Sequence, residues 1–243
     1  MTNLKLCYIL PAHNESLLLK NTVEKLSNRL EQFAESSIII GENASTDGTF
    51  ELAKKLEGQN SKVKVFAFHE SQAGIGYGLH RGLSEALKIH NQEDYWFVLN
   101  GADLPFEFSD LESFIKELQG KREADVYVGS KSHRESVLTR TLLRRIMSLA
   151  FWFLRKVFLG MKTMDSQGSI FLKAKVARIV VDRVLARNFF YTTELIYFAE
   201  REGFTVKEVK IVLNEEKRKT KVRVLKSSFE MIQQIIRLFA RTS

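Results

Sequence analysis

The strongest constraint on the fold is a regular alternation of short apolar runs with longer segments that place apolar residues at helical spacing. Strand-like runs occur at 4–10, 37–40, 63–68 and 95–99, helix-like segments follow at 16–33, 46–56, 77–89 and 108–118, and a further strand is predicted at 124–128. Strands separated by helices in this way favour a mainly parallel sheet. The sequence therefore predicts an α/β fold whose central sheet is flanked by helices on both faces.

Polar residues follow each of the first four predicted strands, as in Pro11 to Glu15, Glu42 to Thr49, Gln72 to Gly76 and Asn100 to Asp103. Because the carboxyl ends of parallel strands meet at one edge of a sheet, we expect these loops to share a cleft. Each loop alone is also compatible with an ordinary turn. The pair Gly74 and Gly76 lacks the third glycine of a dinucleotide fingerprint, so that site is not predicted.

Asp103 stands in the turn after an uncharged run at 95–99 that is typical of a strand buried on both faces. A carboxylate at such a strand end can hold Mg²⁺ or Mn²⁺ beside a phosphate, since these ions prefer carboxylate, water and phosphate oxygens. The same residue could equally shape the turn before the next helix. No second His or Cys stands at metal-ligand spacing from His13, which is therefore interpreted as a loop residue.

The net charge of +8 suits an anionic partner, such as a nucleotide, a lipid phosphate, a membrane surface or nucleic acid. Nucleic acid is not predicted, because the aromatic residues fall mainly in strand-like runs and no binding motif occurs. The single cysteine, Cys7, cannot pair within the chain, which favours a reducing, cytoplasmic setting. No signal peptide is expected, and no uncharged stretch approaches the roughly 20 residues of a membrane-spanning helix.

The alternation weakens after about residue 130. The segment 142–160 mixes large apolar residues with a basic minority, so it is either a buried core helix or a helix lying at a membrane surface, and composition alone slightly favours the core. An amphipathic helix is predicted at 228–240, preceded by the basic segment 217–226.

In this order, the four loops resemble the nucleotide-sugar-binding half of inverting family 2 glycosyltransferases with the GT-A fold, and most closely the dolichyl-phosphate mannose synthase and dolichyl-phosphate glucosyltransferase group. The likeness continues in Gly129, Ser130 and Lys131, in Asp165, Ser166 and Gln167, in Thr193, Glu194 and Leu195, and in the basic stretch 218–222. It implies one transferase domain over 1–225, with a nucleotide-sugar half (1–130) and an acceptor half (131–225), followed by a C-terminal amphipathic helix at 226–243.

The resemblance also implies roles for individual residues. The nucleotide sugar would contact Pro11, Ala12, Asn14, Glu15, Glu42, Asn43, Asp47, Gly74, Ala102 and Asp103. The acceptor phosphate would contact Lys131, Arg144, Arg145, Ser148 and Gln167. Asp103, Asp165 and Lys131 would be catalytic, and Asp103 would bind the metal, Mg²⁺ or Mn²⁺.

The activity implied is the transfer of a sugar from a UDP- or GDP-sugar to a polyprenyl phosphate, with inversion. The acceptor phosphate is already anionic, so the harder task is to stabilise charge on the departing nucleoside diphosphate. A lipid acceptor makes the segment 142–160 a candidate for peripheral attachment to the inner face of a membrane, although an exposed apolar helix could also form a homodimer.

Two positions depart from the family pattern. Gly101 stands where the metal motif has its first carboxylate, and Ile75 stands where the third loop commonly has Lys or Arg. Each loss of a charged contact weakens a site by about 1–3 kcal/mol. We expect an active transferase with an altered metal site, and the alternative is a non-catalytic relative that binds a nucleotide or a partner protein.

Overall fold

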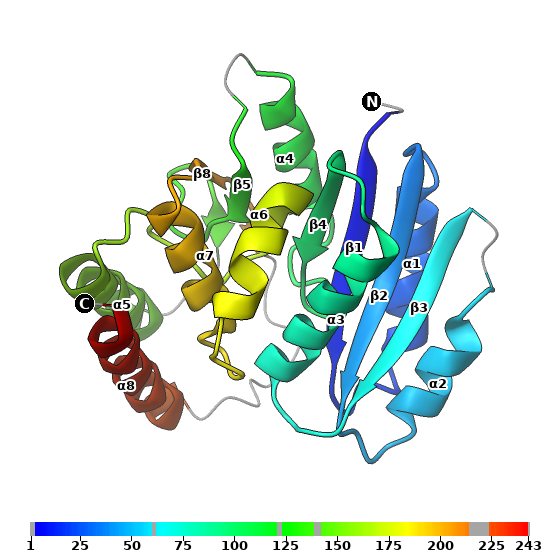
Figure 1. Cartoon of the computed structure of the whole chain (residues 1–243), viewed down its shortest axis with the longest axis horizontal. Coiled ribbons are helices and arrows are strands. Elements are labelled where there is room, and N and C mark those ends of the chain that lie inside the picture. Colours follow the sequence, from blue (N-terminus) through cyan, green and yellow to red (C-terminus); the bar gives the residue numbers. More distant parts are fainter. Residues whose placement is uncertain (1–2, 60–61, 121–122, 139–141, 214–223, 243) are drawn as a thin grey trace.

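The computed structural model describes residues 3–59, 62–120, 123–138, 142–213 and 224–242. Within them, a seven-stranded sheet carries helices on both faces (Figure 1), and a second, two-stranded sheet lies beside it. The strands are β1 (Lys5–Ala12), β2 (Glu35–Asn43), β3 (Val63–Glu70), β4 (Tyr95–Leu99), β5 (Val126–Gly129), β6 (Val137–Leu138), β7 (Ile170–Lys173), β8 (Val206–Val209) and β9 (Val212–Leu213). The helices are α1 (Leu19–Leu30), α2 (Thr49–Leu56), α3 (Ile75–Ile89), α4 (Ser109–Leu118), α5 (Leu142–Leu159), α6 (Ala174–Val180), α7 (Tyr191–Arg201) and α8 (Val224–Thr242), with a 3₁₀ turn at Val181–Arg183.

The large sheet has the order β3-β2-β1-β4-β7-β5-β8, and β7 is its antiparallel strand. Ile9 of β1 lies opposite both Ile39 of β2 and Leu99 of β4. This register brings the carboxyl ends of three parallel strands to one edge of the sheet. The predicted α/β fold with a mainly parallel sheet is confirmed.

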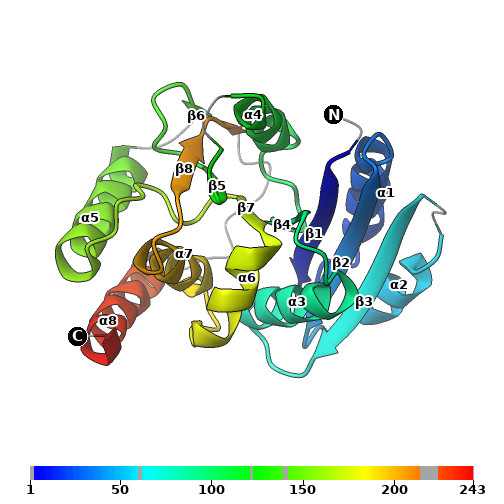
Figure 2. The same cartoon turned by 45° about the horizontal axis from the view of Figure 1, so that its top comes forward.

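Helices lie on both faces of the sheet (Figure 2), and an apolar layer between each set of helices and the sheet holds them together. Side chains alternate along β1, so that Cys7 and Ile9 pack under α3, α6 and α7, whereas Leu6, Tyr8 and Leu10 pack under α1, α2 and α4. Burial raises the pKa of the free Cys7 thiol to about 12, so it stays protonated inside the core.

Helix α3 lies against β2 without side chains between the two backbones. A Cβ atom on Gly78 would lie 2.5 Å from the carbonyl oxygen of Gly41, so a larger residue cannot occupy this crossing. The close approach places the amino end of α3 beside the carboxyl ends of β1 and β2.

The first four strands and helices lie where the periodicity predicts them, but α1 and α2 begin three residues later than expected, at Leu19 and Thr49. Ser16 and Asp47, which precede these helices, hydrogen-bond each other across the two loops. The polar residues ahead of both helices therefore serve the strand-end loops.

Helix α5 is not the core helix that composition slightly favoured. Five of its apolar residues are exposed, namely Ile146, Leu149, Phe153, Val157 and Phe158, and three others on α8 are also exposed, namely Ile232, Ile236 and Phe239. The two helices pack against each other, with the rings of Phe158 and Phe239 6.1 Å apart. No described helix is long and apolar enough to span a membrane.

Candidate functional site

The strand ends open into a pocket of about 270 Å³. Its walls come from the end of β1, the start of α3, the loop after β4, the segment before β7 and the start of α7. The lining residues are Pro11, Ile75, Leu79, Leu99, Asn100, Gly101, Pro105, Phe106, Gln167, Gly168, Ser169, Asn188, Phe189, Tyr191 and Thr192.

The loops after β1 and β2 are bound to each other by backbone-to-side-chain hydrogen bonds. The amide of Asn14 donates to Ser45 Oγ at 3.0 Å, and Asn14 Oδ1 accepts from the amide of Thr46 at 2.9 Å. The amide of Glu15 donates to Thr49 Oγ1 at 2.9 Å. Asn14 has a φ of 53°, a left-handed conformation that Asn tolerates better than most residues. These contacts fix the two predicted nucleotide loops relative to each other.

Asp47 joins the same pair of loops from the other side. Its Oδ2 accepts from the amide and hydroxyl of Ser16 at 3.2 and 2.8 Å, and its Oδ1 accepts from the amide and hydroxyl of Thr49 at 3.1 and 2.5 Å. Partial desolvation opposes ionisation, but the four hydrogen bonds favour the carboxylate and lower the pKa of Asp47 to about 2.

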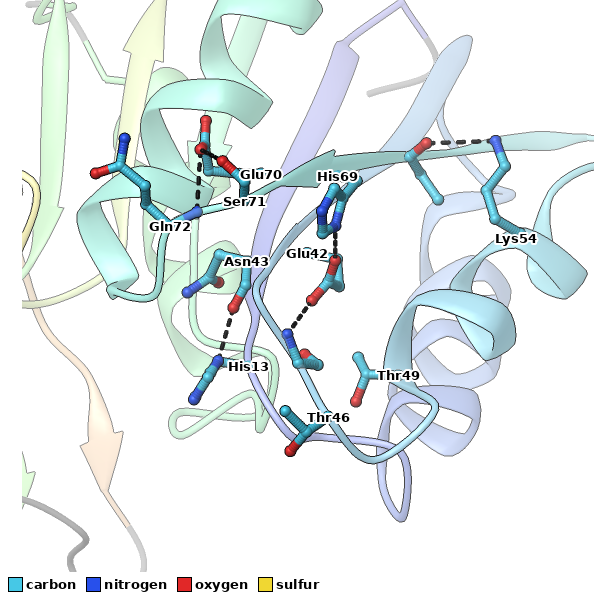
Figure 3. A network of polar contacts seen from close by, with 12 residues as sticks. His13, Glu42, Asn43, Thr46, Thr49, Lys54, His69, Glu70, Ser71 and Gln72 are labelled. Atoms are coloured by element: carbon cyan, nitrogen blue, oxygen red, sulfur yellow. Dashed lines mark hydrogen bonds and ion pairs between the residues drawn. The ribbon is translucent and has the colours of Figure 1, made fainter.

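Glu42, at the end of β2, is fully buried and its carboxylate is held by two donors (Figure 3). The amide of Ser45 donates to Oε1 at 2.6 Å, and Nδ1 of His69 lies 2.5 Å from Oε2. The ring of Phe50 stands 5.1 Å from that of His69. The pairing of His69 with Glu42 follows from the parallel register of β2 and β3, which sequence reasoning did not use.

Asn43 points to the opposite face of the sheet from Glu42, as its neighbour in a strand must. Its backbone carbonyl accepts from Nδ1 of His13 at 2.6 Å (Figure 3). Its side chain is 1% exposed, and neither its Oδ1 nor its Nδ2 has a hydrogen-bond partner among the described residues. This amide lies beside Pro11, which lines the pocket, and leaves its hydrogen-bonding capacity unused within the described part of the chain.

The loop after β4 turns Asn100 inward. Asn100 Nδ2 donates to Asp110 Oδ2 at 3.2 Å, and Asn100 Oδ1 accepts from the amide of Gly101 at 2.8 Å. Asp110 is fully buried at the start of α4, and burial raises its pKa. Its contact with Asn100 was missed from the sequence, where Asp110 is simply an acidic residue in a first helical turn.

Asp103 is exposed at the rim of this loop, while its neighbour Ala102 is buried and accepts a hydrogen bond from Thr22. Asp103 Oδ1 lies 2.6 Å from the position that a Cβ atom on Gly101 would take, so the carboxylate folds back over the pocket-lining glycine. The described residues contain no group of three His, Cys, Asp or Glu side chains placed to hold a metal ion. A metal at Asp103 would therefore need most of its oxygen ligands from substrate and water, which the chemistry of Mg²⁺ and Mn²⁺ beside phosphates allows.

Lys131, Asp165 and Gln167 form a connected group, of which Gln167 lines the pocket. Lys131 Nζ lies 3.1 Å from Asp165 Oδ2 and donates to the Gln167 carbonyl at 2.9 Å. Asp165 also accepts from the amides of Lys131 and Gln167. Burial alone would raise the pKa of Asp165, but the Lys131 ammonium and these amides lower it below its ordinary value.

Gly74, in the third strand-end loop, packs closely against the segment before α7. It has a φ of 145°, and a Cβ atom there would lie 2.8 Å from the Arg187 carbonyl oxygen. Only glycine suits this position, since both its conformation and its space exclude a side chain. Ile75, the next residue, presents an apolar side chain to the pocket where the family pattern has a cation.

The other residues predicted to bind the acceptor phosphate lie on α5. Arg145 is exposed and Ser148 is half-buried, and neither is among the residues that line the pocket. The side chain of Arg144 and the basic stretch 218–222 lie outside the described part of the chain. The structure thus brings Lys131, Asp165 and Gln167 together without joining Arg145 or Ser148 to them.

The chain matches the family described as Glycosyl transferase family 2 over residues 7–178. With the strand order and the strand-end pocket, this match shows that the chain belongs to glycosyl transferase family 2. The family predicted from the sequence is confirmed.

Several curated proteins are similar to this chain. "Glycosyltransferase AglD" of Haloferax volcanii is 27% identical over 233 residues, which are 94% of this chain and 36% of that protein. "UDP-N-acetylglucosamine--dolichyl-phosphate N-acetylglucosaminyltransferase" of Methanococcus voltae is 26% identical, over 85% of each chain. "Dolichyl-phosphate beta-glucosyltransferase" of Drosophila melanogaster is 26% identical, over 86% of this chain and 67% of that protein. The chain thus spans about a third of the first of these relatives and a larger share of the other two.

Solved structures share the fold. Glucosyl-3-phosphoglycerate synthase from Mycobacterium tuberculosis in complex with UDP has a TM-score of 0.66 at 15% identity, over 98% of this chain and 80% of that one. The same enzyme with Mn²⁺, UDP and phosphoglyceric acid has a TM-score of 0.62 at 16% identity, over 96% and 76%. This likeness confirms the predicted GT-A fold.

Proposed function

We propose that this protein transfers a sugar, with inversion, from a nucleoside-diphosphate sugar to the phosphate of a polyprenyl lipid. The proposal rests mainly on one pocket, which is lined on one side by Gly101 and Pro105 of the Asp103 loop and on the other by Gln167, whose carbonyl accepts a hydrogen bond from Lys131. The dolichyl-phosphate transferases among the relatives support a lipid phosphate as acceptor, and the M. voltae relative, which is named for UDP-N-acetylglucosamine, supports a UDP-sugar as donor.

On the donor side, the cross-linked loops after β1 and β2 would hold the nucleoside. The buried Asn43 amide offers both a donor and an acceptor, which suits the polar edge of a base or a ribose. A divalent metal on Asp103 would neutralise negative charge on the diphosphate as it leaves. The bound complexes of the mycobacterial enzyme with Mn²⁺ support a metal of this kind.

On the acceptor side, the phosphate oxygen needs no general base because it is already anionic. That oxygen attacks the anomeric carbon, its new bond to carbon forms, and the bond from carbon to the diphosphate oxygen breaks. The Lys131 ammonium would bind the acceptor phosphate, while Asp165 keeps the ammonium in place and stays ionised. The role assigned to Asp165 is thus to orient Lys131 rather than to accept a proton.

The proposal is tested by incubating the protein with a panel of UDP- and GDP-sugars, Mg²⁺ or Mn²⁺, and a short water-soluble polyprenyl phosphate. We expect transfer with at least one donor, and a loss of about a hundredfold or more in Asp103→Ala. Glu107→Gln, an exposed carboxylate of the same loop, is the matched control and should keep full activity. Full activity of Asp103→Ala would remove the metal assignment.

The alternative is a relative that binds a nucleotide or a partner protein without turnover, and Gly101 and Ile75 are the observations that favour it. Both residues line the pocket at positions where a charged side chain would contact the metal or the diphosphate. Saturable binding of UDP or GDP with no transfer to any acceptor in the panel would decide for this alternative.

We also propose that the protein attaches to the inner, cytoplasmic face of a membrane through α5 and α8. Their adjoining exposed residues form an apolar face, and the net charge of +8 favours anionic headgroups. The same face could be covered by a second copy of the chain. A dimer that persists in light scattering with detergent, and no binding to vesicles, would favour the homodimer.

A further inference from the structure

The helices α5 and α8 turn an apolar face outward, and each also carries an arginine that binds the body of the protein: Arg155 of α5 is buried, whereas the side chain of Arg241 of α8 is 33% exposed. Arg155 of α5 is 1% exposed, which is rare for an arginine. Arg241 of α8 forms an ion pair with Glu194 of α7, whose side chain is 4% exposed. The two arginines act on different segments of the pocket wall.

Arg155 holds the carbonyl groups of the segment that leads to Asp165. Its Nη2 donates to the carbonyl of Met164 at 2.7 Å, and its Nη1 donates to the carbonyl of Thr163 at 3.3 Å. The ring of Phe151, one turn earlier in α5, lies 4.8 Å from the guanidinium carbon. A buried guanidinium that binds two carbonyls fixes where the chain enters Asp165 and Gln167.

Two carboxylates hold the amides of the same segment. Glu200 accepts from the amides of Lys162 and Thr163 at 2.8 and 2.9 Å. Glu208 accepts from the amides of Met164 and Asp165 at 3.2 and 2.9 Å. The negative charges of Asp165, Glu200 and Glu208 act on Arg155 and offset part of the cost of burying its guanidinium.

Arg241 acts on the segment before α7 through Glu194. Oε1 of Glu194 pairs with Arg241, and Oε2 accepts from the amides of Leu185 and Ala186 at 3.1 and 2.6 Å. Two and three residues further on, Asn188 and Phe189 line the pocket. Glu194 thus joins the end of α8 to a pocket wall.

The two walls also contact each other at the pocket. Gln167 Nε2 donates to the carbonyl of Phe189 at 3.3 Å and lies 3.9 Å from the sulfur of Met231 on α8. Both segments and α8 therefore meet at Gln167. A displacement of α5 would reach Gln167 through 163–165, and a displacement of α8 would reach it through Met231 and the segment 185–189.

We propose that Arg155 and Arg241 are positioning residues through which the α5–α8 pair sets the geometry of the polyprenyl phosphate site. The proposal rests on the proposed function, because it takes Lys131, Asp165 and Gln167 as the acceptor side of the pocket. Under this proposal the α5–α8 pair has two roles. Its outer face binds a lipid surface, and its inner contacts hold the site where the lipid phosphate reacts.

The test uses Arg155→Met and Arg241→Met in the full chain, with Arg155→Lys as a milder variant that keeps the buried charge. Lys156→Met and Arg237→Met are the matched controls, since both are exposed cations on the same helices. With a water-soluble polyprenyl phosphate and no membrane, we expect the KM for the acceptor to rise about tenfold or more in both Met variants. The KM for the donor should change less than about twofold, and Arg155→Lys should fall between wild type and Arg155→Met.

Amide hydrogen exchange provides a readout that does not depend on turnover. Arg155→Met should accelerate exchange at 162–167, and Arg241→Met should accelerate exchange at 185–190, while the loops after β1 and β2 keep wild-type rates. A folded Met variant with wild-type exchange at its segment, or with a wild-type acceptor KM, would overturn the proposal. Absence of transfer by the wild-type protein would instead count against the proposed function, and the exchange rates would still decide whether the arginines hold the two segments.

Discussion

At the scale of single residues, Asp47 gives the clearest pH dependence. Its pKa of about 2 lies below the ordinary value of 3.8, so its hydrogen bonds to Ser16 and Thr49 stabilise the folded state above about pH 4. That contribution is lost as the pH falls from about 4 to about 2, because the unfolded state binds the proton near pH 4 whereas the folded state binds it only near pH 2. The effect is modest, since the carboxylate is exposed to solvent.

We therefore expect Asp47→Ala to lower the free energy of unfolding by about 1 kcal/mol at neutral pH. The difference from wild type should shrink as the pH approaches 2. Urea titrations at several pH values measure it, and Glu51→Ala, an exposed acid in the first turn of the same helix, is the control. A difference that stays constant down to pH 2 would mean that the hydrogen bonds do not stabilise the carboxylate.

Gly101 offers a second prediction, because the family carboxylate can be restored there without a backbone clash. A Cβ atom on Gly101 would collide with Asp103 Oδ1, which is the far end of a side chain that can turn away. Gly101→Asp should therefore fold, and Mn²⁺ should increase its affinity for UDP about tenfold more than it does in wild type. Titration calorimetry with and without Mn²⁺ measures this, with Gly101→Asn as the uncharged control. Equal metal dependence in both variants would place the metal elsewhere.

The sequence predicted which residue types occur at the site, but not the direction in which each side chain points. Glu42 and Asn43 are neighbours, yet one pairs with His69 and the other faces Gly78 on the opposite face of the sheet. Arg155 belongs to the basic minority of 142–160, and its burial was not predicted because composition does not say which side of a helix faces the protein. Asp110 and Glu194 likewise acquire their roles from partners far away in the chain.

At the scale of elements, α5 divides its residues between two environments. Phe151 and Leu154 pack against the core, whereas Phe153 and Val157 are 59% and 58% exposed. A helix with one apolar face inside and another outside loses the polar stripe that usually marks its solvent side. This explains why the sequence left its environment open.

Phe153→Asp is expected to reduce attachment to anionic vesicles about tenfold or more, because it places a charge in the apolar face without touching the core. Flotation with vesicles of phosphatidylcholine and phosphatidylglycerol measures the bound fraction. Ile179→Asp on α6, which is also exposed, serves as the control and should bind like wild type. Equal loss in both variants would point to general destabilisation.

At the scale of the whole molecule, the net charge of +8 predicts how salt acts on membrane attachment. Each basic residue near an anionic leaflet contributes roughly 1 kcal/mol, and salt screens this attraction. Binding to anionic vesicles should therefore weaken steeply as salt rises, while the weaker binding to neutral vesicles should change little. Sedimentation across a salt series measures both. Binding to the two vesicle types that does not depend on salt would mean that the apolar face alone attaches the protein to membranes.

The whole-molecule topology was predictable only for its first half. The parallel strands β1 to β4 follow the simple alternation, but β7 and β8 are four residues long and lie among helices and loops of irregular length. Short strands carry little periodicity, and an antiparallel strand between two parallel ones is fixed by contacts distant in sequence. Beyond residue 130 the residue pattern predicted only the helices at 142–160 and 228–240, which correspond to α5 and α8. The family resemblance supplied the other expectations for this half.

The position of β7 has a consequence for how the chain is made. Val98 of β4 and Tyr127 of β5 both lie opposite Phe171, so β5 cannot join the sheet until residue 171 exists. During synthesis on a ribosome, the nascent chain therefore carries β4 as an open edge while about seventy further residues are added, and such edges invite wrong pairing. A stop in translation within that interval would release a polypeptide that contains the first four strands and their loops but lacks β7, the strand that joins β4 to β5.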